Sequence, residues 1–97
     1  MNNNLNFGQA IEALKKGMRV AREGWNGKDM FLFLRPAATV PTTAIYDAEL
    51  RSVIEDEAKG GTFEALASIV MWTADKKLII GWLASQTDML SEDWFIL

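Results

Sequence analysis

The chain has neither cysteine nor histidine among its 97 residues. These absences exclude zinc fingers, haem ligation by these residues, disulfide frameworks and nucleophilic catalysis by a cysteine–histidine pair. A magnesium or calcium site made of carboxylates alone stays open, although the sequence holds no EF-hand loop. We therefore expect no resident cofactor.

The chain also has little net charge and no long apolar run. The net charge is -3, whereas a protein that binds a nucleic-acid polymer normally carries a basic stripe. The longest apolar run, residues 78–84, is far shorter than the roughly 20 residues that span a membrane. The first residues resemble no signal peptide, and missing cysteine is compatible with a reducing compartment. We expect a soluble intracellular protein without membrane partners.

Hydrophobic residues make up 49% of the chain and include four tryptophans and five phenylalanines. The length fits one domain over residues 1–97. Two interpretations of the tryptophans are open. They either fill a small core or line a pocket that stacks flat ligands.

The N-terminal third contains the clearest structural patterns. Apolar spacing predicts a helix over residues 6–17, with Asn6 and Gln9 as a capping box and Gly17 at its end. Alternation predicts a strand over residues 18–22. The continuous apolar run 30–34 predicts a strand buried on both faces, paired with the first through a turn.

The rest of the chain continues the α+β pattern. Pro36 and Pro41 indicate a loop over residues 35–41, and an acidic amphipathic helix is predicted over residues 42–58. That helix either packs on the sheet by one face or forms an oligomer contact. The later predicted elements are a hairpin of strands 68–72 and 77–82, a short helix from Ser85, and an edge strand over 94–97. The predicted architecture is a leading helix and an antiparallel sheet of four or five strands, with two further helices.

The first candidate binding segment is the loop from Arg22 to Lys28. Trp25 lies between two glycines there, and Arg22, Asn26 and Lys28 offer donors beside it. The alternative is a plain hairpin turn whose tryptophan packs on the sheet. The second candidate segment is residues 82–88, where Trp82 precedes Ser85, Gln86, Thr87 and Asp88 at a helix start. Helix capping explains Ser85 and Asp88 but leaves Gln86 and Thr87 unexplained.

Enzymatic chemistry has little support in the sequence. Ser85 and Asp88 lack the histidine or lysine that would activate a hydroxyl. Glu92 and Asp93 are neighbours in sequence and are more simply explained as helix-surface charge. We expect a protein that binds without catalysing a reaction.

Two ordered groups of motifs resemble a known family. The first comprises residues 7–17 (FGQAIEALKKG), 20–22 (VAR), 24–28 (GWNGK) and 30–34 (MFLFL). The second comprises residues 82–90 (WLASQTDML) and 92–94 (EDW). They are similar to the second Thoeris anti-defence family, a small family of phages and bacteria.

The resemblance implies a phage protein that acts in the cytoplasm of the infected host. Members sequester a cyclic ADP-ribose isomer, the Thoeris immune signal, without degrading it, and some also hold cyclic dinucleotides at separate sites. They are homotetramers of α+β protomers with ligand pockets where subunits meet.

On this basis we assign expected roles to the two candidate segments. Trp25 and Trp82 would stack on the ligand, and Gln86 and Asp88 would contact ribose or base. The phosphates would meet Arg22, Lys28, Thr87 and the backbone amides of residues 85–87. The alternative is an inhibitor that uses the same aromatic surface to bind a bacterial defence protein.

Overall fold

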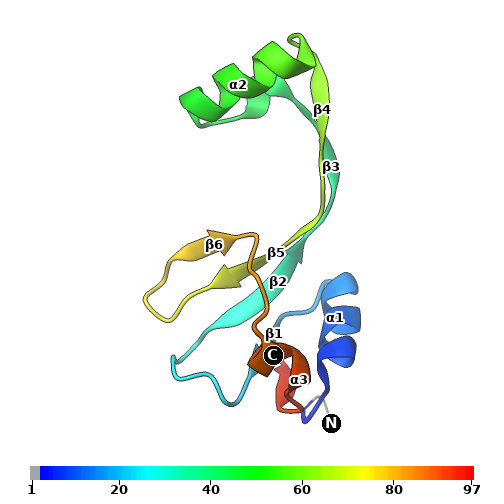
Figure 1. Cartoon of the computed structure of the whole chain (residues 1–97), viewed down its shortest axis with the longest axis vertical. Helices are drawn as coiled ribbons and strands as arrows, with labels where there is room; N and C mark the ends of the chain where they lie inside the picture. Colours follow the sequence, from blue (N-terminus) through cyan, green and yellow to red (C-terminus); the bar gives the residue numbers. More distant parts are fainter. Residues whose placement is uncertain (1–2) are drawn as a thin grey trace. The chain divides into compact units, whose positions relative to one another are not determined.

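The computed structural model describes residues 3–97, which form two compact units (Figure 1). One unit comprises the described residues up to Arg35 together with Ser68–Leu97. The other is Pro36–Ala67. Each unit has its own sheet, and both candidate binding segments belong to the first.

Helix α1 (Phe7–Lys15) begins as the sequence predicts. The Asn6 side chain accepts the Gln9 backbone N–H at 2.8 Å, and the Gln9 side chain accepts that of Asn6 at 2.9 Å. Gly17, with φ of 85°, takes the left-handed conformation that ends the helix. The predicted helix and its capping box are confirmed.

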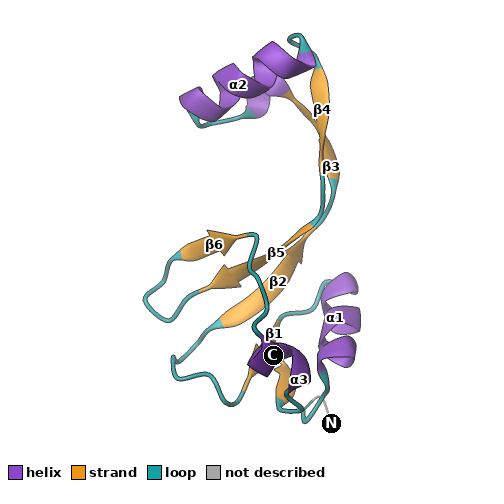
Figure 2. Cartoon of the chain, in the orientation of Figure 1, coloured by secondary structure: helices purple, strands orange, loops and turns teal. Residues whose placement is uncertain are grey.

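The sheet of the first unit is antiparallel and has the strand order β6-β5-β2-β1-β7 (Figure 2). Its strands are β1 (Val20–Arg22), β2 (Phe31–Arg35), β5 (Ser68–Trp72), β6 (Leu78–Ile80) and β7 (Trp94–Ile96). Both predicted hairpins and the predicted C-terminal edge strand are confirmed. Helix α3 (Gln86–Leu90) lies between β6 and β7, and Arg35 pairs with Ser68 where the chain leaves and rejoins the sheet. The α+β class predicted from the sequence is therefore confirmed.

The core lies between α1 and one face of this sheet. Val20, Leu32 and Met71 are paired across neighbouring strands, and Val20 and Leu32 are fully buried. Ala10 and Leu14 meet them from α1, and Trp94 of β7 completes the same cluster. Arg22 is two residues beyond Val20, so its side chain lies on this helical face.

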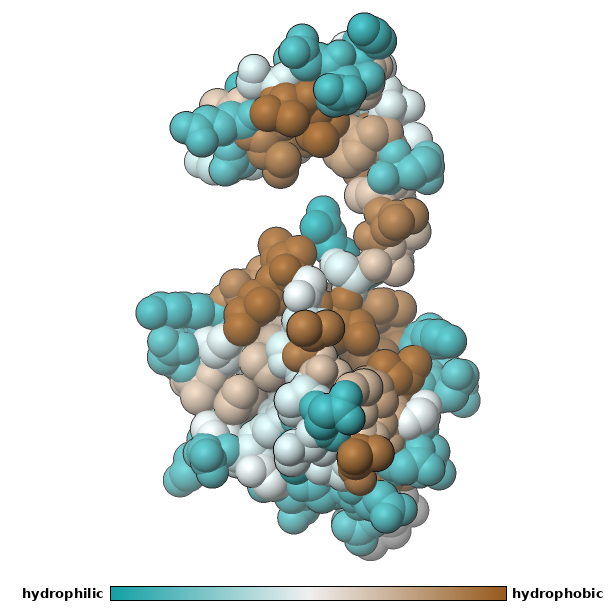
Figure 3. All heavy atoms as spheres, in the orientation of Figure 1, coloured by the Kyte–Doolittle hydropathy of each residue, from teal (hydrophilic) through white to brown (hydrophobic). Residues whose placement is uncertain are grey.

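The opposite face of the sheet, which we call the open sheet face, is also apolar. Its side chains are Phe31, Phe33, Trp72, Leu78 and Ile80, together with Val70, which is buried between Phe33 and Ile80. The prediction that strand 30–34 is buried on both faces is wrong, because Leu32 is fully buried whereas Phe33 is 37% exposed. The reason is that α1 covers only the face to which Leu32 points. Figure 3 shows hydrophobic side chains gathered over the part of the sheet that contains β6.

The second unit pairs β3 (Ala38–Pro41) with β4 (Thr62–Ala65). The predicted loop over residues 35–41 is therefore partly wrong. Pro41 closes the pairing opposite Thr62 at the end of a two-stranded ribbon, where proline is tolerated. Between the strands lie a 3₁₀ turn (Thr42–Ala44) and helix α2 (Ala48–Ala58).

The predicted start of the helix at residue 42 is also wrong. Ile45 is extended, and the helix begins after Asp47, whose side chain accepts the Leu50 backbone N–H at 3.0 Å. Tyr46 is fully exposed, and Leu50 and Val53 are more than half exposed. This cap was not evident from the sequence, because the spacing of apolar residues continues through the extended residue Ile45. No helix within residues 3–97 has the length and apolarity needed to cross a membrane.

Candidate functional site

The structure brings the two predicted segments together at a cluster of tryptophans. Trp25 comes from the loop between β1 and β2, and Trp82 from the segment between β6 and α3. Their ring centroids are 6.3 Å apart, and Trp94 lies 5.4 Å from Trp25 and 6.4 Å from Trp82. All three pairs are edge-to-face, the arrangement that the charge distribution of aromatic rings favours.

The three tryptophans differ in exposure, and therefore in whether their side chains are accessible to a ligand. Trp94 is completely buried, and its indole Nε1–H donates to the backbone oxygen of Asp88 at 3.0 Å. Of the two interpretations of the tryptophans, Trp94 therefore fits the filling of a small core. Trp25 and Trp82 are half-buried and pack on the core from outside. These two are the members of the cluster that remain partly exposed.

Arg22 occupies the centre of a charged network beside this cluster. Its NH1 group donates to Asp88 Oδ1 at 2.7 Å, and its Nε donates to Asp93 Oδ1 at 2.9 Å. The Arg22 side chain is only 10% exposed. A guanidinium buried this far is stable because two carboxylates balance its charge. The hydrogen bond with Asp93 raises the pKa of Arg22 above its ordinary value, against the opposing effect of burial.

Asp88 links the charged network to the first turn of α3. Its Oδ1 also accepts the Trp25 Nε1–H at 3.1 Å, and its Oδ2 accepts the Ser85 backbone N–H at 3.1 Å. Ser85 Oγ accepts the Asp88 backbone N–H at 3.0 Å, so the predicted capping box is confirmed. Burial opposes ionisation of Asp88, but hydrogen bonds from Arg22, Ser85 and Trp25 hold its pKa below the ordinary value.

Asp93 is the residue of this network that sequence reasoning missed. It lies beyond the end of α3, so its interpretation as helix-surface charge is wrong. Its Oδ2 accepts the Gly24 backbone N–H at 2.8 Å, and the hydrogen bond from Arg22 lowers its pKa. No local pattern of the sequence signals this role, but Gly24 leaves the space that the contact needs. A Cβ atom there would lie 2.7 Å from Asp93 Oδ2 and 2.9 Å from Arg22 NH2.

The model of the Thoeris anti-defense 2-like domain matches residues 5–97 of this chain. The chain belongs to this family. A curated relative, Thoeris anti-defense 2 of Bacillus phage SP01, is 41% identical over 96 residues. That alignment covers 99% of this chain and 98% of the relative. The family is thus one of anti-defence proteins, as the resemblance of the motifs implied.

The remaining predicted residues of this Thoeris anti-defense 2-like protein lie at the surface around the cluster. They are Asn26, Lys28, Ser85, Gln86 and Thr87, and each is exposed. The carbonyl of Thr87 accepts the Ser91 hydroxyl at 2.6 Å. The phosphate role expected for Arg22 stays a prediction, since its guanidinium donates here to carboxylates. Among residues 3–97, no acidic cluster suited to a metal ion is present.

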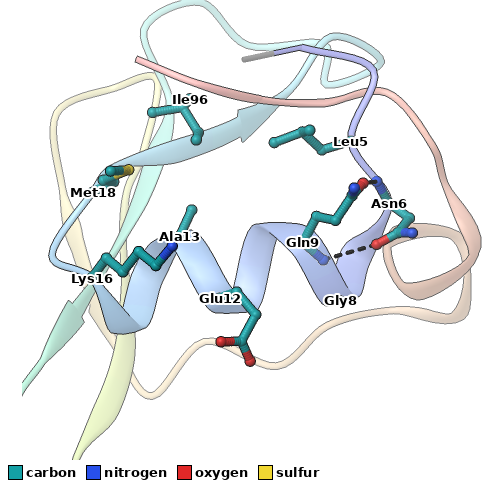
Figure 4. A pocket seen from close by; sticks show the side chains of 9 residues that line it. All are labelled: Leu5, Asn6, Gly8, Gln9, Glu12, Ala13, Lys16, Met18 and Ile96. Carbon is teal, nitrogen blue, oxygen red and sulfur yellow. Dashed lines mark hydrogen bonds between the residues drawn. The ribbon is translucent and has the colours of Figure 1, made fainter. Parts of the chain in front are cut away.

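A separate groove of about 530 Å³ runs beside α1 (Figure 4). Leu5, Ala13, Met18 and Ile96 provide its apolar side chains, and Lys16 lies at one end. The predicted binding residues of this family member lie instead around Trp25 and Trp82. The groove and the tryptophan site are therefore distinct features of the first unit.

Proposed function

We propose that this protein is a phage anti-defence protein that binds and sequesters a cyclic ADP-ribose-type nucleotide in the cytoplasm of the infected host. Capture would keep the signal from the Thoeris effector without degrading it. Family membership and the name of the curated relative support an action against Thoeris. The observation that carries the choice of ligand is the meeting of Trp25 and Trp82 amid exposed polar side chains.

The chemistry of the site suits a flat, negatively charged ligand. Stacking of a nucleobase on an aromatic ring contributes about 1–3 kcal/mol. Nanomolar capture needs about 12 kcal/mol, so the pyrophosphate and riboses must contribute too. Lys28 is exposed beside Trp25 and supplies a cation, while Asn26, Ser85, Gln86 and Thr87 supply neutral donors and acceptors.

The state of the carboxylates supports binding without turnover. A general acid or base works best when its pKa lies near the working pH. The pKa values of Asp88 and Asp93 are instead lowered from the ordinary value of an aspartate, because hydrogen bonds from Arg22 favour their ionised forms and outweigh the effect of burial. Both stay charged at neutral pH and serve Arg22, which suits a protein that holds its ligand intact.

Capture is tested by incubating the protein with cyclic ADP-ribose, its glycosidic isomers and cyclic dinucleotides, then heating to denature it. We expect one cyclic ADP-ribose isomer to leave solution and to return unchanged after heating. Trp82→Leu retains apolar bulk but removes the stacking ring, and should weaken capture about tenfold to hundredfold. Tyr46→Ala removes a fully exposed aromatic side chain of the second unit and should bind normally.

Each other outcome of this experiment contradicts part of the proposal. Return of an opened or shortened nucleotide would indicate an enzyme. If no nucleotide is depleted while the protein still blocks Thoeris in cells, it acts instead as an inhibitor that binds a defence protein. Normal capture by folded Trp82→Leu would place the binding site elsewhere.

We also propose that the protein assembles as a homotetramer through its open sheet face. Phe33, Leu78 and Ile80 are 37%, 50% and 59% exposed on that face, while α1 and α3 lie on the other. A second copy offers an identical apolar face, and two such sheets pack face to face about a two-fold axis. The number of four protomers is inferred from the resemblance to the family. The open sheet face supports one of the contacts that such a tetramer needs.

Light scattering after gel filtration tests the assembly. We expect the mass of four protomers for the wild-type chain and a smaller species for Phe33→Glu, because a charge would be buried in the contact. Leu90→Glu places the same charge on an exposed leucine of α3 and should leave the mass unchanged. A monomeric wild-type protein at micromolar concentration would overturn the assembly.

A further inference from the structure

The loop that presents Trp25, Asn26 and Lys28 is held at its start by Asp93. The backbone oxygen of Asp93 accepts the Glu23 N–H at 3.1 Å, and its Oδ2 accepts the Gly24 N–H at 2.8 Å. Asp93 lies just before β7, which pairs with β1. One residue from the C-terminal end of the chain therefore fixes two successive amides immediately before Trp25.

The same carboxylate is joined to the second binding segment through Arg22. The Arg22 Nε donates to Asp93 Oδ1, and the NH1 of the same guanidinium donates to Asp88 Oδ1. Asp88 in turn accepts from the indole of Trp25 and from the backbone of Ser85. Hydrogen bonds therefore connect Asp93 to both segments.

We propose that Asp93 is a positioning residue for ligand capture, which with Arg22 holds the Trp25 loop and the start of α3 in one fixed relative placement. This inference rests on the proposed function. Asp93 contacts no ligand in this scheme. It acts because a site ordered before binding loses less conformational freedom when the ligand arrives.

Asp93→Asn tests this inference with little change in side-chain volume. The asparagine retains one carbonyl oxygen, but its amide N–H₂ turns a donor toward the donors of Arg22 or Gly24. In the ligand-free protein, we expect the amides of Glu23 and Gly24 to exchange hydrogen about tenfold faster, while amides of the core strands keep their rates. The affinity for the captured cyclic ADP-ribose isomer should fall about tenfold in protein that remains folded.

Two further variants separate positioning from a general loss of stability. Asp93→Glu restores the negative charge and should recover part of the affinity. Asp75→Asn makes the same chemical change in an exposed turn, where Asp75 pairs with Lys77, and should alter neither exchange at Gly24 nor affinity. A role in stability alone would lower the melting temperature of Asp93→Asn but leave its affinity unchanged below that temperature.

The outcomes distinguish this inference from the proposed function. Unchanged exchange at Gly24, or faster exchange with full affinity, overturns the positioning role. If the wild-type protein captures none of the nucleotides, the proposed function fails and with it the role of Asp93 in capture. Faster exchange at Gly24 would then still assign Asp93 to placement of the loop.

Discussion

Trp94→Ala should lower the free energy of unfolding by about 4 kcal/mol, the largest effect expected of a single substitution in this protein. The side chain is completely buried and contacts Phe7 of α1 as well as Trp25 and Trp82. Its removal leaves a cavity between the helix and the sheet, and Trp25 and Trp82 both lose a packing partner. Urea denaturation monitored by far-ultraviolet circular dichroism, at one fixed protomer concentration, measures the change.

Two other variants serve as comparisons for the stability loss of Trp94→Ala. Trp94→Phe retains most of the bulk but removes the donor to the Asp88 carbonyl, so about 1–2 kcal/mol should be lost. Leu90→Ala shortens a side chain that is 78% exposed and should change stability by less than about 0.5 kcal/mol. A loss below about 1 kcal/mol for Trp94→Ala would contradict the placement of Trp94 at the centre of the core.

Arg22→Met should lower the free energy of unfolding by about 3 kcal/mol at neutral pH. Methionine replaces the apolar stem of arginine but leaves Asp88 and Asp93 without their counter-ion. Their side chains are 11% and 31% exposed, so water replaces only part of the lost interaction. Lys15→Met removes one partner of an exposed pair with Glu12 on α1 and should cost less than about 0.5 kcal/mol.

The free energies of unfolding of the wild-type protein and Arg22→Met should differ by an amount that depends on pH. This dependence shows whether lost charge or lost packing causes the difference. In the wild-type protein, the folded-state pKa values of Asp88 and Asp93 are lowered, so their stabilisation is lost as the pH falls below 3.8. In Arg22→Met, burial is opposed only by the hydrogen bonds from Ser85 and Trp25, so the pKa of Asp88 is lowered less than in the wild-type protein and the variant loses less stability in acid. The stability difference between the two proteins should therefore narrow in acid. A difference that is constant with pH would show that lost packing, and not lost charge, causes the effect.

The sequence predicts those parts of the fold that are encoded by neighbouring residues. The α1 capping box, the Ser85–Asp88 cap and both hairpins depend on residues a few positions apart, so their patterns are visible in one dimension. The start of α2 was misplaced because apolar spacing continued through the extended residue Ile45. The ribbon of β3 and β4 was missed because its partners lie on either side of that helix.

The candidate site shows the same division between local and distant information. Trp25 and Trp82 were identified from the glycines and polar residues beside them, and the structure brings them together. The role of Asp93 depends on a pairing with Arg22 across 71 positions of sequence, which no local pattern encodes. The continuous apolar run of β2 gave no sign that its two faces differ, and only the position of α1 shows which face is covered.

The pairing of Arg35 with Ser68 means that the chain leaves the first sheet and returns to it at adjacent positions. The segment between them is a compact unit with its own strand pairing, so a change in its length need not disturb the strands of the first sheet. Insertions and deletions there leave Arg22, Asp88 and the tryptophans in register. We therefore expect residues 36–67 to tolerate changes in length that leave the sheet and the tryptophan cluster of the first unit intact.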